Sequence, residues 1–289
     1  MIRSIRAFYL ATATGCCFFF FWLGSWCLSW IVLPVVRLVN FRRTAGERTR
    51  ACQDIVGFGF RLFLGSMRWT RTLVFHPSRV CLDLPDGPFL LIANHPTLID
   101  VTAIMAVHPR ICCVAKTELF QSFLAGRLLR YCGHIEGGGD GPLDGLTVIP
   151  QAIDRLREGR SVLIFPEGTR SPAHGLRRFK PGAFEICRRT KVPLASLLIT
   201  CEPPTLLKGL AWYALPKRTA HYRISQLPTL DANAVSGNPQ GTAGRVQALF
   251  RDQLDALRES ASASGAESPA FESADRPVAL RRGANHARS

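Results

Sequence analysis

The amino-acid sequence predicts an α/β fold, with a mostly parallel central sheet flanked by helices and an N-terminal membrane-embedded helical segment. Two observations predict the sheet. Short apolar runs alternate with helix-like stretches in the middle of the chain, and two of these runs stop at a polar turn that contains proline. The helical segment is predicted because residues 7–36 contain no charged residue.

Strands and helices are expected to alternate from residue 88 onward. The apolar runs predict strands at residues 88–93, 111–115, 161–165, 193–200 and 220–224. Helical periodicity predicts helices at residues 97–107, 118–131, 146–158, 182–189 and 243–257. A cluster of glycines between positions 137 and 141 predicts a loop.

Residues 7–36 are predicted to lie in a membrane. About 20 apolar residues suffice to cross a bilayer, so this stretch is long enough to span it with tilt or to enter and return as a hairpin. It is too long for the core of a signal peptide. Arg3 and Arg6 precede it, whereas arginines at positions 37, 42, 43, 48 and 50 follow it. This excess predicts that the following domain lies on the cytoplasmic side.

Residues 55–75 mix aromatic residues and leucines with Arg61, Arg68 and Arg71. The arginines argue against a second span. A basic helix with aromatic residues suits the plane of a membrane interface, and the alternative is a helix that packs on the globular domain. We therefore predict four segments: a membrane anchor, a basic amphipathic interfacial segment, a globular domain and a disordered tail, at residues 1–40, 41–80, 81–258 and 259–289.

The chain has 289 residues and a formal net charge of +15 at pH 7. Its basic residues alternate with apolar ones near the N-terminus and form no compact nucleic-acid motif, so the expected partner is an anionic membrane surface. The ten cysteines form no C-x-x-C pair and have no histidine partners at zinc spacing. We expect free thiols in a reducing compartment and predict no metal site.

A general base is predicted at His95, where the apolar run 89–93 ends. Pro96 stops the strand, and a helix that starts near Thr97 places Asp100 about one turn in. A carboxylate on one ring nitrogen fixes the imidazole tautomer and makes the other nitrogen a better proton acceptor. No G-x-S-x-G elbow occurs in the chain, so the hydroxyl that His95 deprotonates is expected to belong to a substrate.

A second polar cluster follows the strand predicted at residues 161–165. It contains Glu167, Gly168, Thr169 and Arg170. Glycine lets the backbone approach a ligand closely, and the planar fork of an arginine suits phosphate or carboxylate. Ligands bind at the carboxyl ends of strands in open α/β sheets, so both clusters are expected to face one crevice.

These two clusters resemble the motifs of the glycerolipid acyltransferases, the family that includes the lysophosphatidic acid acyltransferases. Residues 94–100 match the family's N-H-x-x-x-x-D motif, and residues 165–171 match its F-P-E-G-T-R-S motif. Val192 and Pro193 resemble a later V-P motif. The resemblance spans roughly residues 85–200 and implies a membrane-bound O-acyltransferase of phospholipid biosynthesis.

The resemblance implies that His95 and Asp100 are the catalytic residues. The expected substrate contacts come from the second motif and from two lysines, at Glu167, Gly168, Thr169, Arg170, Lys116 and Lys180. Backbone amides near the His95 turn are expected to stabilise the oxyanion. No cofactor or metal is implied, because the acyl donor, acyl-coenzyme A or acyl carrier protein, is a substrate.

Three residues outside the two motifs have alternative interpretations. Lys116 follows a strand, where it either meets a phosphate of the acyl donor or is merely solvated. Lys180 resembles a basic position of the family and lies beside a predicted helix N-terminus, which favours anion binding. His134 is either a second titrating group or an ordinary polar side chain in a loop.

The sequence departs from the family at its middle motif, G-x-x-F-I-x-R. The corresponding stretch begins with Gly133, His134 and Ile135, but no arginine follows. In the family that arginine helps to hold the phosphate of the acceptor. Either Arg170, Lys180 or Lys116 replaces it, or the acceptor is not a phosphoglycerol.

The predicted reaction is transfer of a fatty acyl group from acyl-coenzyme A or acyl carrier protein to a lysophospholipid hydroxyl, with 1-acylglycerol-3-phosphate as the first candidate. One alternative is the same chemistry on another acceptor, such as an amino-acid lipid. The other is a non-catalytic membrane protein that binds lipid. The expected location is a membrane, with the catalytic domain on the cytoplasmic face of a bacterial inner membrane. The sequence makes no prediction of oligomeric state.

Overall fold

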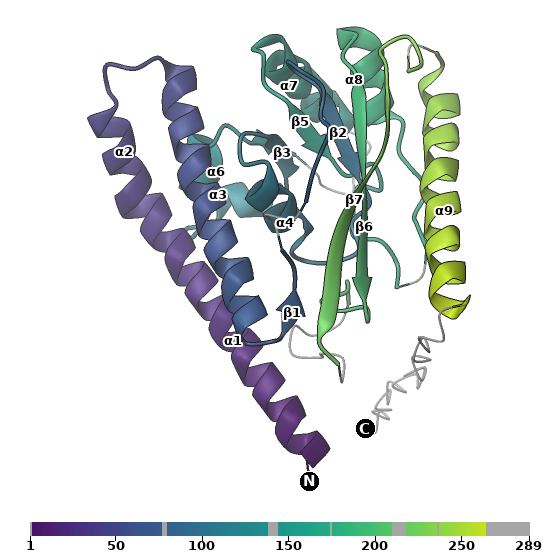
Figure 1. Ribbon diagram of the computed structural model, residues 1–289. Coiled ribbons are helices and arrows are strands. Elements are labelled where there is room, and N and C mark those ends of the chain that lie inside the picture. The colour runs from purple at the N-terminus through teal and green to yellow at the C-terminus, as the bar shows by residue number, and fades with distance from the viewer. Residues whose placement is uncertain are drawn as a thin grey trace, which may run out of the picture.

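The centre of the fold is a seven-stranded sheet. The structure is a computed structural model, and it describes residues 2–76, 80–137, 144–173, 175–209, 218–235 and 237–263. Within these residues the strand order is β1-β7-β6-β2-β5-β3-β4 (Figure 1). The strands are β1 Leu73–Val74, β2 Leu90–Ala93, β3 Cys112–Ala115, β4 Ile135–Glu136, β5 Val162–Ile164, β6 Leu194–Glu202 and β7 Ala220–Leu230. This arrangement, with helices on both faces, confirms the predicted fold class.

The register of the central strands brings the two predicted motifs together. β2 pairs in parallel with β5, with Leu90 opposite Val162 and Ile92 opposite Ile164. Both strands therefore end at the same edge of the sheet. β2 also pairs in parallel with β6, whereas β6 and β7 are antiparallel. The turns that follow β2 and β5 are consequently adjacent, as the sequence predicted.

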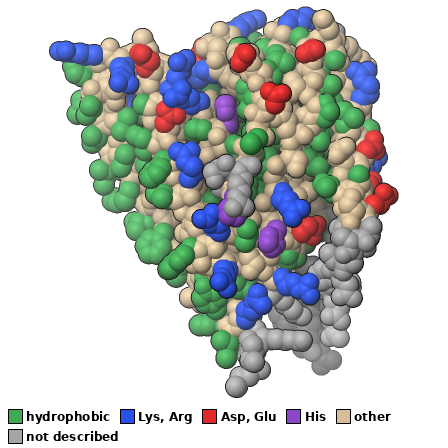
Figure 2. All heavy atoms as spheres, in the orientation of Figure 1, with side chains coloured by type: hydrophobic (Ala, Val, Ile, Leu, Met, Phe, Trp, Pro, Cys, Tyr) green, Lys and Arg blue, Asp and Glu red, His purple; other side chains and the backbone are tan. Residues whose placement is uncertain are grey.

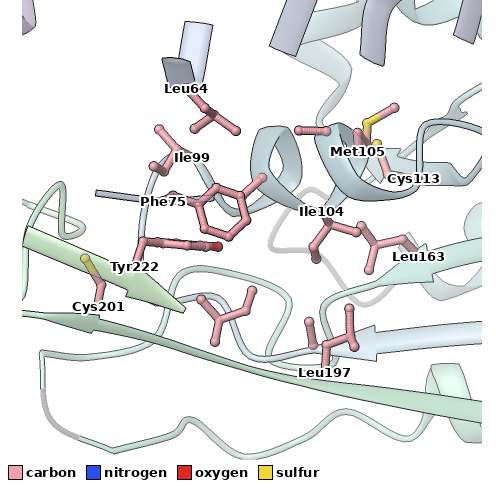
Figure 3. Close-up of a cluster of buried hydrophobic side chains, with 14 of the residues drawn as sticks. Leu64, Phe75, Ile99, Ile104, Met105, Cys113, Leu163, Leu197, Cys201 and Tyr222 are labelled. Atoms are coloured by element: carbon pink, nitrogen blue, oxygen red, sulfur yellow. The ribbon is translucent and has the colours of Figure 1, made fainter. Parts of the chain in front are cut away.

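Helices cover both faces of the sheet and enclose two separate cores. On one face, α4 (Asp100–Val107) lies between the sheet and α3 (Ala45–Trp69). Figure 3 shows part of this core, in which Leu64 of α3 and Ile104 of α4 pack with Leu163 of β5. The other face is covered by α7 (Asp144–Arg157), α8 (Gly182–Thr190) and α9 (Pro239–Ala263).

The N-terminal segment forms a long helical rod beside the domain (Figure 1). It comprises α1 (Ile2–Cys27), a π-helical stretch η1 (Leu28–Val32) and α2 (Leu33–Val39). Within it, Phe8–Val39 is long and apolar enough to cross a membrane, and only 22% of its most apolar window is buried. α3 then runs back beside α1 and starts at a capping box, in which Thr44 and Glu47 bond each other's backbone amides.

α3 falls within the segment predicted as interfacial, and it has two different faces. One face is buried and contains Cys52, Val56 and Met67. The other leaves Phe58 and Trp69 exposed. The buried face packs on the globular domain, as the alternative interpretation of this segment expected. The exposed face carries the aromatic residues from which an interfacial helix was predicted.

The helix predicted over residues 118–131 is wrong as a single element. Two short helices replace it, α5 (Thr117–Gln121) and α6 (Gly126–Tyr131). The break frees two backbone carbonyls that an uninterrupted helix would use internally. The Leu124 carbonyl accepts hydrogen bonds from Ser25 and Ser29 at 3.0 and 2.8 Å, and the Phe123 carbonyl accepts one from Trp30 at 2.9 Å. Side chains of the N-terminal helices therefore supply the donors that these two carbonyls would find inside an uninterrupted helix.

Two short edge strands were absent from the prediction. β1 pairs with β7, and β4 pairs with β3 inside the altered middle motif. Each has only two residues, too few to show an alternating pattern. Gly133, just before β4, has φ +66°, and a Cβ there would lie 2.2 Å from an Arg160 guanidinium nitrogen. Most of the loop predicted from the glycines between positions 137 and 141 lies outside the described residues, which end at Gly137 and resume at Asp144.

Other boundaries shift by a few residues. α4 begins at Asp100 rather than near Thr97, and β7 continues to Leu230, beyond the predicted end at 224. α9 runs from Pro239 to Ala263 and so enters the stretch predicted as a tail. The remainder of that predicted tail, 264–289, lies outside the described residues.

Gly126 provides a test of the break between α5 and α6. A Cβ at this position would lie 2.2 Å from the Phe120 carbonyl oxygen, whereas one at Gly65 in α3 would meet nothing within 4 Å. We predict that Gly126→Ala destabilises the protein by about 1–3 kcal/mol, and that the control Gly65→Ala is neutral or stabilising by up to about 1 kcal/mol. Thermal unfolding in detergent measures both. Equal unfolding temperatures for the two variants would contradict the close approach.

Candidate active site

His95 and Asp100 form a hydrogen-bonded pair at the end of β2. His95 Nδ1 lies 2.6 Å from Asp100 Oδ2. The Asp100 side chain is fully buried, whereas 19% of the His95 side chain is exposed. The His95 ring stacks on Phe165, with centroids 4.2 Å apart. The imidazole is thus fixed by one nitrogen and one face, which leaves Nε2 as the nitrogen that can meet a substrate.

The Asp100 carboxylate accepts hydrogen bonds from three residues. Oδ2 accepts from His95 and from the Thr97 amide at 2.8 Å. Oδ1 accepts from the Thr97 hydroxyl and, at 2.9 Å, from the Tyr222 hydroxyl. The amide and the hydroxyl of Thr97 thus both donate to the side chain of Asp100, the first residue of α4. Both oxygens of this buried carboxylate are thus hydrogen-bonded.

Tyr222 reaches the site from β7, 122 positions along the chain from Asp100. Its ring packs edge-on against Phe75, with centroids 5.0 Å apart, in the core drawn in Figure 3. Burial, reinforced by the charge of Asp100, raises the pKa of Tyr222 well above its usual value. The hydroxyl therefore stays protonated and acts as a donor. Tyr222 is a positioning residue that the sequence reasoning missed, because nothing in the order of residues links β7 to the first motif.

Glu167 supports the turn that carries His95. Its side chain is only 3% exposed, and both carboxylate oxygens are engaged by the protein. Oε1 accepts from the His95 amide at 3.2 Å and from the Ser171 hydroxyl at 2.5 Å, while Oε2 accepts from the Arg177 amide at 2.7 Å. The Ser171 amide in turn donates to the His95 carbonyl at 2.7 Å. This geometry favours a positioning role for Glu167 over the substrate contact predicted from the sequence.

Three cations surround the turn at Gly168–Arg170. Arg170 Nη1 donates to the Leu206 carbonyl at 3.0 Å, and Lys208 Nζ donates to Thr169 Oγ1 at 2.8 Å. Lys180 Nζ lies so close to Gly168 that a Cβ there would come within 2.8 Å of it. Gly168 has φ +70°, which only glycine adopts readily. Among the described residues, no carboxylate forms a salt bridge with any of these cations.

The charge of Arg170 is maintained despite its partial burial. Burial lowers the pKa of Arg170 from its usual value, and the nearby charge of Asp100 opposes this effect. A guanidinium remains protonated under such conditions. Lys116 is the cap residue of α5, and it lines the same cavity as Arg170, Lys180 and Lys208. The cavity therefore combines one base with four cationic side chains.

The amides of the His95 turn are occupied, contrary to their predicted role as oxyanion donors. The Thr97 amide donates to Asp100, and the Leu98 amide donates to the Leu206 carbonyl. The His95 amide donates to Glu167. Within the described part of the chain, the amides of Thr169 and Arg170 have no backbone or side-chain acceptor. Successive amides after a left-handed glycine form an anion-binding concavity. These two amides are therefore the better candidates for stabilising negative charge.

A single large cavity connects this polar cluster to the N-terminal helices. Its volume is about 1690 Å³. Its lining combines His95 and the cations with apolar side chains of α1, α3 and α4, including Phe18, Phe63 and Met105. A cavity of this form accommodates a molecule with a charged head and a hydrocarbon chain.

His134 does not act as a second base. It is 5% exposed, and its Nδ1 accepts the Cys113 amide at 3.2 Å. Burial, assisted by the charge of Arg160, lowers the pKa of His134 to about 4. All ten cysteines are free thiols, as predicted. Cys113 lines the cavity, but burial raises its pKa to about 12, which does not suit a nucleophile.

Comparison with known proteins supports the interpretation of the motifs. Residues 78–200 match the family profile described as Acyltransferase. Several curated relatives named 1-acyl-sn-glycerol-3-phosphate acyltransferase match 40–59% of the chain. The middle of the chain, residues 78–200, is therefore similar to the acyltransferase family. Both motifs quoted from the sequence lie inside the matched residues.

Two relatives illustrate the extent of the match. The human 1-acyl-sn-glycerol-3-phosphate acyltransferase beta is 30% identical over 176 residues, which cover 59% of this chain and 60% of that protein. A relative from Chlamydomonas reinhardtii is 30% identical over 122 residues, 42% of this chain and 37% of the relative. The match thus spans between about a third and three fifths of these relatives' own length.

A solved structure shares the fold of most of the chain. The 1-acyl-sn-glycerophosphate acyltransferase PlsC from Thermotoga maritima superposes with a TM-score of 0.64 over 89% of this chain and 98% of that chain. Sequence identity is 20%, so this similarity concerns the fold alone. The chain therefore shares the fold of that structure, including the sheet and its helical layers.

Tyr222→Phe tests the positioning role of the β7 hydroxyl. Removing one hydrogen bond to a buried charged group costs about 1.5–3 kcal/mol, so we predict that kcat falls at least about tenfold while KM is nearly unchanged. The control is Tyr131→Phe, which removes a hydroxyl that meets Arg127 outside the cavity. A raised KM with an unchanged kcat would show that Tyr222 does not position Asp100. Equal activity of the two variants would show the same.

Proposed function

We propose that this protein transfers a fatty acyl group from a thioester donor to the hydroxyl of a lysophospholipid. The observation that carries the proposal is the His95–Asp100 pair, whose exposed imidazole edge faces a cavity with a cationic head and an apolar interior. A positioned base and an apolar cavity that admits the hydrocarbon chain of a hydroxyl substrate are what acyl transfer to a lipid requires.

The reaction proceeds in two proton transfers. His95 Nε2 takes the proton of the acceptor hydroxyl as its oxygen attacks the thioester carbonyl carbon. Asp100 stabilises the imidazolium that forms and holds its orientation. The tetrahedral intermediate then collapses with cleavage of the carbon–sulfur bond, and His95 returns the proton to the departing thiolate. The amides of Thr169 and Arg170 are placed to stabilise the oxyanion.

The cations around Gly168 favour an acceptor that carries a phosphate. Arg170, Lys180 and Lys208 lack carboxylate partners among the described residues, so an anionic group would neutralise them. They can replace the arginine that the middle motif lacks. This supports 1-acylglycerol-3-phosphate as acceptor over a neutral or amino-acid lipid. Lys208 was not predicted, because it lies beyond the second motif and resembles no family position.

The donor and the location belong to the same proposal. Acyl-coenzyme A and acyl carrier protein both carry a phosphate that Lys116 can meet, and no further cofactor is required. The apolar N-terminal helix supports attachment to a membrane, with lipids as partners. The arginines after that helix support a catalytic domain on the cytoplasmic face of a bacterial inner membrane.

His95→Ala tests the proposed base. A positioned base contributes about 10² to 10⁴ in rate, so we predict a loss of this size in kcat with the acceptor still bound. The matched control is His221→Ala, an exposed histidine on β7. Acyl transfer in detergent, read by mass spectrometry of the product, measures both variants. Undiminished turnover in His95→Ala would exclude His95 as the base.

Arg170→Gln and Lys208→Gln test the phosphate contacts. We predict that each raises KM for 1-acylglycerol-3-phosphate about tenfold and leaves KM for the acyl donor unchanged, because a charge-assisted hydrogen bond is worth about 1.5–3 kcal/mol. Lys191→Gln, at the end of α8 and outside the cavity, is the control. If the donor KM rises instead, these cations hold the donor's phosphate.

A further inference from the structure

A second set of cationic side chains lies outside the catalytic cavity, where the N-terminal rod meets α6. Arg37 lies over the Tyr131 ring, 5.0 Å from its centroid. Arg127 lies over the Trp30 ring at 4.4 Å and near the Tyr131 ring at 5.9 Å. None of these four residues lines the cavity that contains His95. We name Trp30, Arg37, Arg127 and Tyr131 the arginine–aromatic cluster.

The two arginines of this cluster are held by aromatic faces rather than by carboxylates. In the described part of the chain, neither Arg37 nor Arg127 forms a salt bridge. Arg127 Nη2 donates to the Tyr131 hydroxyl at 3.3 Å. A guanidinium stacked on a ring is fixed in orientation while most of its in-plane donors remain available for an anion.

The cluster lies on the border of an extended apolar surface. Several large apolar side chains of the N-terminal rod are exposed, among them Phe19, Phe20, Leu23, Ile31, Val35, Leu38 and Val39. Figure 2 shows hydrophobic side chains over the left edge of the molecule, where Figure 1 places α1 and α2, with Lys and Arg side chains at its upper end. Tryptophan and tyrosine typically lie at the level of lipid headgroups.

The catalytic domain itself is part of this border. Trp30 donates to the Phe123 carbonyl, its ring lies 4.7 Å from the Phe123 ring, and the Phe123 side chain is 64% exposed. The α5–α6 break is thus tied to the rod by hydrogen bonds and presents an aromatic side chain beside Trp30. A planar membrane surface that receives the rod would also meet this turn and the two arginines.

We propose that the arginine–aromatic cluster binds the phosphodiester headgroup of an anionic phospholipid at the membrane surface. The rod supplies the apolar contact, the two guanidiniums supply charge complementarity, and the aromatic rings hold them at headgroup level. This contact fixes how the domain sits on the bilayer. The inference does not depend on acyl transfer, because it uses no residue of the catalytic cavity.

Short-chain phosphatidylglycerol and phosphatidylcholine with the same acyl chains are the probes. They are titrated into the full-length protein in detergent, with unfolding temperature as the readout of binding. We expect tighter binding of phosphatidylglycerol, weakened about fivefold by Arg37→Gln and by Arg127→Gln, since each basic residue near a membrane surface contributes on the order of 1 kcal/mol. Arg110→Gln is the control, because Arg110 already forms a salt bridge with Asp54.

Three results would overturn the inference. They are equal affinity for the two lipids, unchanged phosphatidylglycerol affinity in Arg127→Gln, and equally strong, Arg127-dependent binding of soluble glycerol 3-phosphate. If Arg37→Gln does not fold, Arg127→Gln alone decides. Acyl transfer is measured on the same samples, and both variants are expected to keep the basal kcat. If a variant loses the preference for phosphatidylglycerol but keeps its turnover, the cluster acts independently of catalysis. If turnover is absent while the preference remains, the proposed function fails and this inference stands.

Discussion

Asp100 carries a carboxylate that is completely removed from solvent, and the site depends on how that charge is satisfied. An unpaired buried charge is too costly to persist, so each of its hydrogen bonds constrains a part of the fold. Thr97 fixes the entry into α4, His95 fixes the end of β2, and Tyr222 fixes β7 relative to both. The same contacts that make Asp100 tolerable inside the protein therefore set the position and tautomer of the imidazole.

Glu167 plays a comparable part from the neighbouring strand. The parallel register of β2 and β5 places the two turns side by side, and the buried Glu167 carboxylate bonds the His95 amide and the Arg177 amide. The next residues, Gly168–Arg170, line the cavity, and within the described residues the amides of Thr169 and Arg170 have no acceptor in the protein. One carboxylate thus holds the base in place, while the turn after it presents positive charge to the acceptor.

Much of this arrangement could be predicted from the sequence, because it depends on local patterns. The apolar runs before Asn94 and Pro166 gave the central strands, and the five-residue spacing of His95 and Asp100 placed both at one turn. Other features depend on contacts between distant segments. Three features, the roles of Tyr222 and Lys208 and the break before Gly126, depend on contacts outside their own local pattern. Local periodicity carries no information about such contacts. The positioning contacts of Glu167 were not predicted for the same reason, since they depend on the pairing of β5 with β2.

The central claim is that this cavity uses its base on a lipid acceptor recognised by its phosphate. The most direct measurement supplies the purified full chain in detergent with acyl-coenzyme A or acyl carrier protein and either 1-acylglycerol-3-phosphate or its phosphate-free counterpart, monoacylglycerol, and identifies products by mass spectrometry. The account predicts diacylated product from the phosphate-bearing acceptor and little or none from monoacylglycerol. Equal turnover of both acceptors, or no product from either donor, would contradict it.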